Sequence, residues 1–193
     1  EEIDNILTNL NIRCQHEKVY TLHQQRLLLS LYLLMEAPLR LNFFSTSLYI
    51  DRGSNWIEKK DDDLILHLIH DKVSHKIGPS DYVLPRHIKG MIEKLEDFFP
   101  GVERKYLITN QSDPALPIDD EKAIHKPNGS KLLRTIEGCD GEHSKLTIDT
   151  IRSAFCTWYL SDQDKTTQER ETVAKKMRSS LAVMEKSYRK VNV

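Results

Sequence analysis

The last part of the chain carries a tyrosine whose neighbours could support phosphate chemistry. Tyr188 follows a basic stretch with Lys175, Lys176 and Arg178, then two serines and a short apolar run. A phenol with a pKa of ~10 is a weak nucleophile at neutral pH, so it attacks a phosphodiester only where cations neutralise the phosphate. The segment therefore predicts a tyrosine presented to a phosphate. A basic stretch of this kind is usually a solvated face, but these three cations would also suit the phosphates of DNA.

Other cations suited to this chemistry are spread along the chain. Arg40 follows an apolar segment, and Arg152 lies near the start of another. A guanidinium forks onto two phosphate oxygens and stays charged, so both arginines are candidates for binding the reacting phosphate. Lys72 lies in a turn between predicted strands, where a lysine could protonate the leaving oxygen. Lys76 on the same turn is the alternative proton donor and otherwise a candidate DNA contact.

The elements that must position these residues are predicted to form one helix-dominated α+β domain. Thr21 and Gln24 fit a capping box that opens a buried helix, and Pro38 ends it. Phe155 and Trp158 are expected to face the core, whereas Arg152 is expected to point away from it. A small three-stranded antiparallel sheet is expected from segments 47–51, 56–60, 64–70 and 82–84. Helices are predicted at 3–10, 21–35, 85–98, 130–137, 147–160, 166–176 and 180–188, with a long loop at 110–128.

Composition limits the class of protein. The 193 residues are 39% hydrophobic and 30% charged, with a net charge of -1 and three scattered cysteines. No apolar run reaches the ~20 residues that span a bilayer, and the cysteines do not suggest a disulfide framework. We therefore expect an intracellular protein of the nucleus or cytoplasm that is not secreted. The near-neutral charge argues against an obvious nucleic-acid binder, although it can hide a basic face.

The order Arg40, Lys72, Arg152, Tyr188 resembles the catalytic domain of tyrosine recombinases, the phage-integrase family. The resemblance runs from about residue 21 to residue 191. In that family an arginine follows the first long helix, a lysine lies on a β-hairpin, and a His-x-x-Arg motif opens a buried helix. A Gly-His-Ser type of turn then precedes the nucleophilic tyrosine. The short motifs Pro-Leu-Arg at Arg40 and Met-Arg-Ser-Ser at Arg178 look most like those of the divergent recombinases of large eukaryotic DNA viruses and their mobile elements.

The resemblance implies a function as well as a fold. Residues 1–193 would form a single catalytic domain with a core at about 21–191, and the N-terminal core-binding domain would be absent. The domain would cleave and rejoin double-stranded DNA through a 3′-phosphotyrosine, with no metal and no other cofactor. It would act as a homo-oligomer, a tetramer on DNA and a monomer or dimer without it, and would not involve a membrane.

The chain departs from the family pattern at three positions. Asp149 replaces the histidine of His-x-x-Arg, Ser153 replaces a histidine after the second arginine, and Ser179 replaces the histidine or tryptophan of the last turn. Asp149 and Ser179 remain in the expected catalytic set, and His75 or His143 could supply the missing imidazole. These departures leave open a recombinase-derived module that binds DNA with weak or no catalysis. A helical interaction domain without a DNA role is a third possibility.

A metal site is not expected from the histidines. His67 and His70 are three residues apart in a predicted strand, so they would face opposite sides of the sheet. Four further histidines, His75, His87, His125 and His143, fit no ligand spacing.

Overall fold

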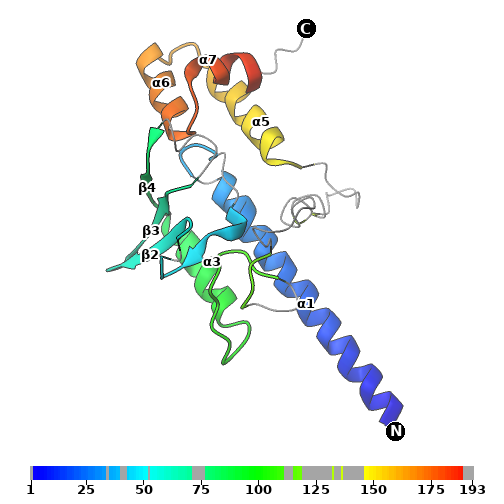
Figure 1. The fold of residues 1–193 in the computed structure, drawn as a ribbon. Coiled ribbons are helices and arrows are strands. Elements are labelled where there is room, and N and C mark those ends of the chain that lie inside the picture. Colours follow the sequence, from blue (N-terminus) through cyan, green and yellow to red (C-terminus); the bar gives the residue numbers. More distant parts are fainter. Residues whose placement is uncertain are drawn as a thin grey trace.

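A computed structural model describes residues 2–33, 35–39, 43–51, 53–70, 77–110, 115–118, 132, 136 and 146–188. The protein is α+β and about half helical, with one small mixed sheet. The elements, in chain order, are α1 (Glu2–Leu33), η1 (Phe43–Ser45), β1 (Ser47–Leu48), β2 (Trp56–Lys60), β3 (Asp63–Leu68), β4 (Ser80–Val83), α3 (Arg86–Glu96), α5 (Ile148–Ser161), α6 (Thr167–Lys176), α7 (Leu181–Val183) and the π-helical turn η2 (Met184–Tyr188). Figure 1 shows the sheet beside α1 and α3, with α5, α6 and α7 grouped at one end of the molecule.

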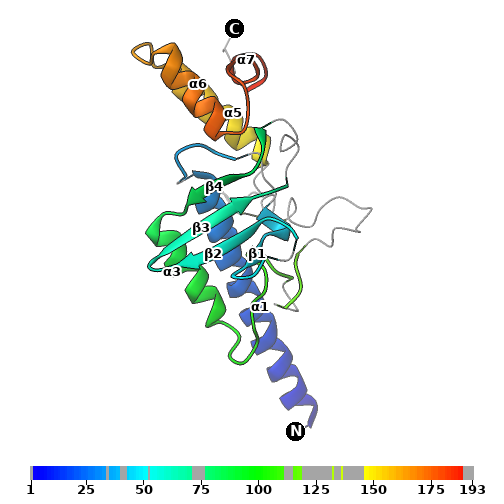
Figure 2. The ribbon, with the colours of Figure 1, turned by 60° about the vertical axis from the view of Figure 1, so that its left-hand side comes forward.

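Helix α1 is continuous, which corrects the expectation of two helices with a capping box at Thr21. The Thr21 hydroxyl donates to the carbonyl of Glu17 one turn earlier, so this residue lies inside the helix. A threonine can bond back to the preceding turn in this way, and residues 11–20 contain no glycine or proline to stop the helix. The N-terminal half of α1 extends away from the rest of the protein in both views (Figures 1 and 2).

The sheet has four strands in the order β1-β2-β3-β4, not three, and it is mixed rather than purely antiparallel. β1 pairs with β2 in parallel, with Leu48 opposite Ile57. β2, β3 and β4 are antiparallel neighbours, with Ile57 opposite Leu66 and Leu66 opposite Tyr82. The alternation of side chains indicates strands but not their direction, so the sequence could not distinguish the two pairings.

The main core lies between the sheet and the helices α1 and α3. Figure 2 shows both helices behind the sheet. The buried side chains of this core include Leu27, Leu28, Leu31, Ile57, Leu66, Ile88, Ile92 and Leu95. These residues recur at helical spacing in α1 and α3 and alternate in β2 and β3, as a helix-on-sheet layer requires.

A second, smaller core holds the C-terminal helices together. Cys156, Leu160, Ala174, Met177, Met184 and Tyr188 are buried in it, with Ala37 from the segment after α1. Trp158 is not part of this core, because 69% of its surface is exposed. The expectation that Trp158 faces inward was therefore wrong, whereas Phe155 is partly buried against the cluster.

Three C-terminal and central helices lie close to their predicted positions. Helix α3 follows Pro85, and α5 and α6 follow Thr147 and Thr166. Both threonine side chains accept a hydrogen bond from the third residue of their helix, and both form capping boxes. Short-range capping of this kind is encoded locally, so the sequence alone predicted these helices. The predicted helix at 130–137 and the loop at 110–128 lie largely outside the described residues.

A buried polar network joins α1 to the segment before residue 110. The Arg104 guanidinium donates to the Tyr20 hydroxyl, to the Thr109 hydroxyl, to the Gln24 side-chain carbonyl and to the backbone carbonyl of Leu107. The Thr109 amide also donates to Gln24 at 2.7 Å. Arg104 is thus buried with polar partners on both of its terminal nitrogens, as a structural arginine requires.

None of the helices described here is long and apolar enough to cross a membrane.

We expect Ile57→Ala to lower the free energy of unfolding by about 3 kcal/mol, because Ile57 is fully buried in β2 and its loss leaves a cavity in the main core. Lys59→Ala, on an exposed position of the same strand, is the matched control and should change it by less than about 0.5 kcal/mol. Urea unfolding followed by circular dichroism measures both. Equal effects of the two variants would contradict the position assigned to the core.

Candidate active site

Arg152 is fully buried in the first turns of α5, with no exposed surface. Its Nη1 donates to the carbonyl of Pro38 at 2.6 Å and to the carbonyl of Met177 at 3.2 Å. The expectation that Arg152 points away from the core was therefore wrong. It lies on the buried stripe of α5 because segments remote in sequence, those of Pro38 and Met177, cover that side of the helix.

Tyr188 lies directly against Arg152. The Cζ atom of Arg152 is 4.8 Å from the centre of the Tyr188 ring, and only 5% of Tyr188 is exposed. This contact places the guanidinium over the face of the aromatic ring, where the ring quadrupole attracts a cation. Tyr188 is the last residue of the π-helical turn Met184–Tyr188. Turns of this type are rare and frequently lie at functional sites.

The Arg152 guanidinium has donors without partners. Within the described part of the chain, neither Nε nor Nη2 forms a hydrogen bond, although both are buried. An unsatisfied buried donor costs roughly 1–3 kcal/mol, and more on a charged group. Nε and Nη2 lie on one edge of the guanidinium, and together they can donate hydrogen bonds to two oxygens of one anion. Arg152 and Tyr188 therefore provide a cationic edge and a phenol at one place.

Arg40 lies outside the described residues. The two residues before it are described. Pro38 accepts a hydrogen bond from Arg152, and Leu39 is buried. Pro38 thus lies at the site, while the role expected of Arg40 remains a prediction. Lys72 and Lys76 also lie outside the described residues.

Asp149 and Ser153 lie on an open face of α5. Asp149 is exposed in the first turn and Ser153 is half-buried. Both line a shallow groove of about 680 Å³ along the helix, together with Thr150, Ala154, Thr157, Trp158 and Ser161. Trp158 is exposed along this groove, and Asp149 precedes Arg152 by one turn of the same helix.

The four cations expected to contact DNA have different surroundings. Lys175 is exposed, whereas Lys176 forms an ion pair with Glu36. Arg178 is only 1% exposed, and its guanidinium donates to Ser80 and Gly78. The expectation that Arg178 contacts DNA is therefore corrected, because its side chain turns back onto the sheet. Lys76 is the fourth and is outside the described residues.

Ser179 lies at the end of the turn that follows α6. Its amide donates to the carbonyl of Ala174 at 2.9 Å, and its side chain is half-buried. The turn is adjacent to the site, because the carbonyl of Met177, two residues earlier, accepts from Arg152.

Two residues near Arg152 were not expected in the site. Tyr32 in α1 is buried, and burial raises its pKa while the nearby charge of Arg152 opposes the rise. Burial also raises the pKa of Cys156 to about 11, again opposed by Arg152, and its sulfur is 3.8 Å from that of Met177. Cys156 is four residues after Arg152, so helical spacing could have placed it on the same face. No local signal pointed to Tyr32.

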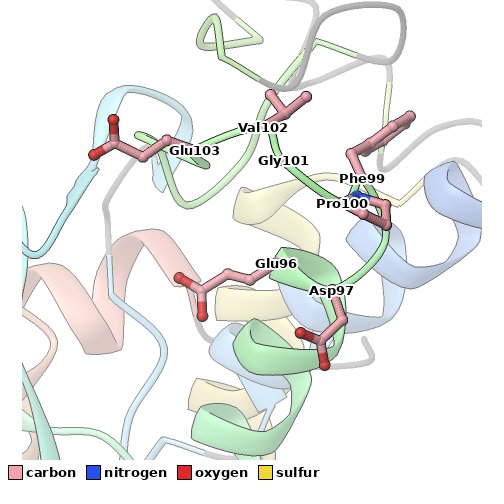
Figure 3. Close-up of a pocket in the computed structure, with 7 residues that line it drawn as sticks. All are labelled: Glu96, Asp97, Phe99, Pro100, Gly101, Val102 and Glu103. Atoms are coloured by element: carbon pink, nitrogen blue, oxygen red, sulfur yellow. The ribbon is translucent and has the colours of Figure 1, made fainter.

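A separate hollow of about 390 Å³ lies after α3 and is lined by Glu96, Asp97, Phe99, Pro100, Gly101, Val102 and Glu103. Burial raises the pKa of Glu96. In Figure 3 the three carboxylates do not converge on one point. Across the residues that the structure describes, no group of three or more His, Cys, Asp or Glu side chains is arranged to hold a metal ion. This hollow gives no basis for a site comparable to that of Arg152.

Comparisons with models of protein families, with curated proteins and with solved structures found no match to this chain. The candidate site therefore rests on its residues and their geometry.

We expect Tyr188→Phe to leave the free energy of unfolding within about 1 kcal/mol of wild type, because the ring and its contact with Arg152 are kept. Tyr188→Ala removes a buried ring from the smaller core and should cost about 3–5 kcal/mol. Chemical denaturation measures the pair. If the alanine variant were as stable as the phenylalanine variant, the ring would not be packed as described.

Proposed function

We propose that this chain is the catalytic domain of a DNA breaking-and-rejoining enzyme with Tyr188 as its nucleophile. The observation that carries the proposal is the buried Arg152 guanidinium, which lies against the Tyr188 ring with two donors unpartnered among the described residues. The proposed enzyme is of the tyrosine-recombinase type and would have the fold that the resemblance implies. It rests on the order of the cations along the chain and on this pair.

The charge of Arg152 favours an anionic ligand. No carboxylate forms an ion pair with Arg152 within the part of the chain that the structure describes. A buried charge without a counterion is strongly unfavourable, so a bound anion would satisfy both the charge and the two open donors. A phosphodiester has the matching charge and two non-bridging oxygens for a guanidinium edge.

The proposed reaction exchanges one phosphate ester for another. The Tyr188 oxygen forms a bond to phosphorus as its proton passes to a water molecule, and the bond from phosphorus to the 5′-oxygen of DNA breaks. The leaving 5′-oxygen takes a proton, for which Lys72 is the proposed donor and Lys76 the alternative. A 5′-hydroxyl of a second strand reverses the reaction and restores a phosphodiester. Arg152, with Arg40 as the second proposed cation, would stabilise the charge that develops on the phosphate.

The proposed partner is double-stranded DNA, and the proposed working unit is a homo-oligomer, a tetramer on two duplexes. Exposed Lys175 is a candidate phosphate contact. The replacements at Asp149, Ser153 and Ser179 leave the domain without imidazoles at the positions where the resemblance expects them. These replacements predict slower acid–base steps than in the family pattern.

A second candidate function is a module that binds DNA without cutting it. The burial of Tyr188 favours this candidate, because the tyrosine must approach phosphorus in order to attack. A binding module would keep the Arg152 phosphate site and lose only the attack. The two functions therefore differ in covalent chemistry and not in affinity.

The deciding experiment is covalent trapping on nicked DNA. A pool of labelled duplexes with random sequence, each nicked beside a central phosphate, lets the cleaved fragment diffuse away and leaves the adduct. We expect an adduct that survives detergent with wild type and none with Tyr188→Phe. Arg152→Ala should slow its formation about 10²–10³-fold, the usual effect of removing one transition-state donor.

Tyr159→Phe is the matched control, because Tyr159 lies in α5 within the same small core and is not proposed to react. It should form the adduct at the wild-type rate. Wild type that binds the pool with salt-dependent affinity but forms no adduct would establish the binding module instead. The absence of both binding and adduct would leave the helical interaction domain.

A further inference from the structure

The turn that follows α6 is a Schellman motif with an unusual residue at its left-handed position. The Arg178 amide donates to the carbonyl of Lys175 at 2.8 Å, and the Ser179 amide donates to that of Ala174 at 2.9 Å. Arg178 has a φ of 53°. Glycine is the usual residue here, because a Cβ atom disfavours this conformation. An arginine at this position therefore costs backbone stability, which the contacts of its side chain must offset.

The Arg178 side chain joins the turn to the start of β4. It is buried, with Nη1 donating to the Ser80 hydroxyl at 2.7 Å and Nη2 to the carbonyl of Gly78 at 2.8 Å. A second bond supports the same junction, since the Tyr82 hydroxyl donates to the carbonyl of Lys176 at 3.2 Å. The sheet and the C-terminal helices are thus tied together at the turn.

The same turn also holds Arg152. The carbonyl of Met177, the residue before Arg178, accepts from Nη1 of Arg152 at 3.2 Å. One short segment therefore sets the position of the Arg152 guanidinium on one side and of the β4 start on the other. Ser179, which belongs to the expected catalytic set, follows directly in the chain.

We propose that Arg178 is a positioning residue, which fixes the turn 177–179 against β4 and thereby orients Arg152 toward Tyr188. The part of the proposal that concerns catalysis rests on the function proposed above. Arg178 does not contact DNA in this role, because its guanidinium is buried among protein acceptors.

The structural part is tested first by amide hydrogen exchange. Arg178→Gly keeps the left-handed turn and removes the guanidinium, so we expect roughly tenfold faster exchange at the amides of Ser80, Tyr82 and Ser179. The amide of Ile57 in β2 should be unchanged. Asp61→Gly is the matched control, because Asp61 also has a positive φ of 51° but lies in the β2–β3 turn. It should leave all of these amides unchanged, and unchanged exchange in Arg178→Gly would overturn the proposal.

Ser80→Ala removes only one acceptor and provides a milder variant should Arg178→Gly fold poorly. If the contact is real, the effect of Ser80→Ala on exchange should largely disappear in the Arg178→Gly background, because both changes break the same bond. Fully additive effects would overturn the contact. Arg178→Lys should retain part of the protection, because an ammonium can reach one acceptor but cannot fork onto two.

The catalytic part is tested on the nicked duplex pool. For Arg178→Gly we expect about tenfold slower adduct formation at saturating DNA, with an unchanged salt dependence of binding. A phosphate contact would instead lower the salt slope by about 1 and weaken binding, which would overturn the positioning role. Faster exchange with a wild-type rate of adduct formation would also overturn it. Wild type without any adduct would refute the proposed function. The exchange results would still decide whether Arg178 holds the turn 177–179 against β4.

Discussion

The position of the Arg152 guanidinium depends on three segments that are far apart in the sequence. Pro38 comes from the segment after α1, Met177 from the turn after α6, and Tyr188 from the π-helical turn η2. A buried guanidinium needs acceptors in fixed directions, so its presence constrains how these segments pack. The small C-terminal core of Cys156, Met177, Met184 and Tyr188 is arranged around that constraint.

Three arginines are buried among the described residues, and their guanidinium donors have different numbers of hydrogen-bond partners. Arg104 donates to four acceptors through both terminal nitrogens, although its buried Nε has no hydrogen-bond partner among the described residues. Arg178 donates to Ser80 and Gly78 through both of its terminal nitrogens. Arg152 uses only Nη1 toward the described residues, and leaves Nη2 and Nε open. Arg104 and Arg178 therefore fit a structural role, whereas the arrangement of Arg152 fits a ligand of opposite charge.

The site also lies where the two cores meet. Arg152 is in the helix α5, whose buried residue Ile151 packs in the main core while Cys156 packs in the smaller one. A shift of the C-terminal helices relative to the sheet and α1 would therefore move the guanidinium relative to Pro38. The bonds from Arg178 and Tyr82 across the junction limit such movement. This gives a physical reason for an arginine at a position that glycine would fill with less strain.

The sequence by itself determined what depends on short-range chemistry. The helices predicted at 85–98, 147–160 and 166–176 correspond to α3, α5 and α6, and the structure shows that Thr147 and Thr166 cap the last two by contacts within one turn. The alternation in β2 and β3 likewise indicated strands. The residue types of the site, a phenol and guanidiniums, were visible in the same way, although no spacing could show which would meet.

Only the tertiary structure decided what depends on distant partners. The parallel direction of β1, the continuity of α1, the burial of Arg152 and the exposure of Trp158 each differed from expectation. The face of α5 that is covered is set by Pro38 and Met177, which helical periodicity does not contain. The contact of Arg152 with Tyr188 and the hydrogen bond of Arg178 to Ser80 also depend on distant partners, because each joins side chains that are close only after the chain has folded.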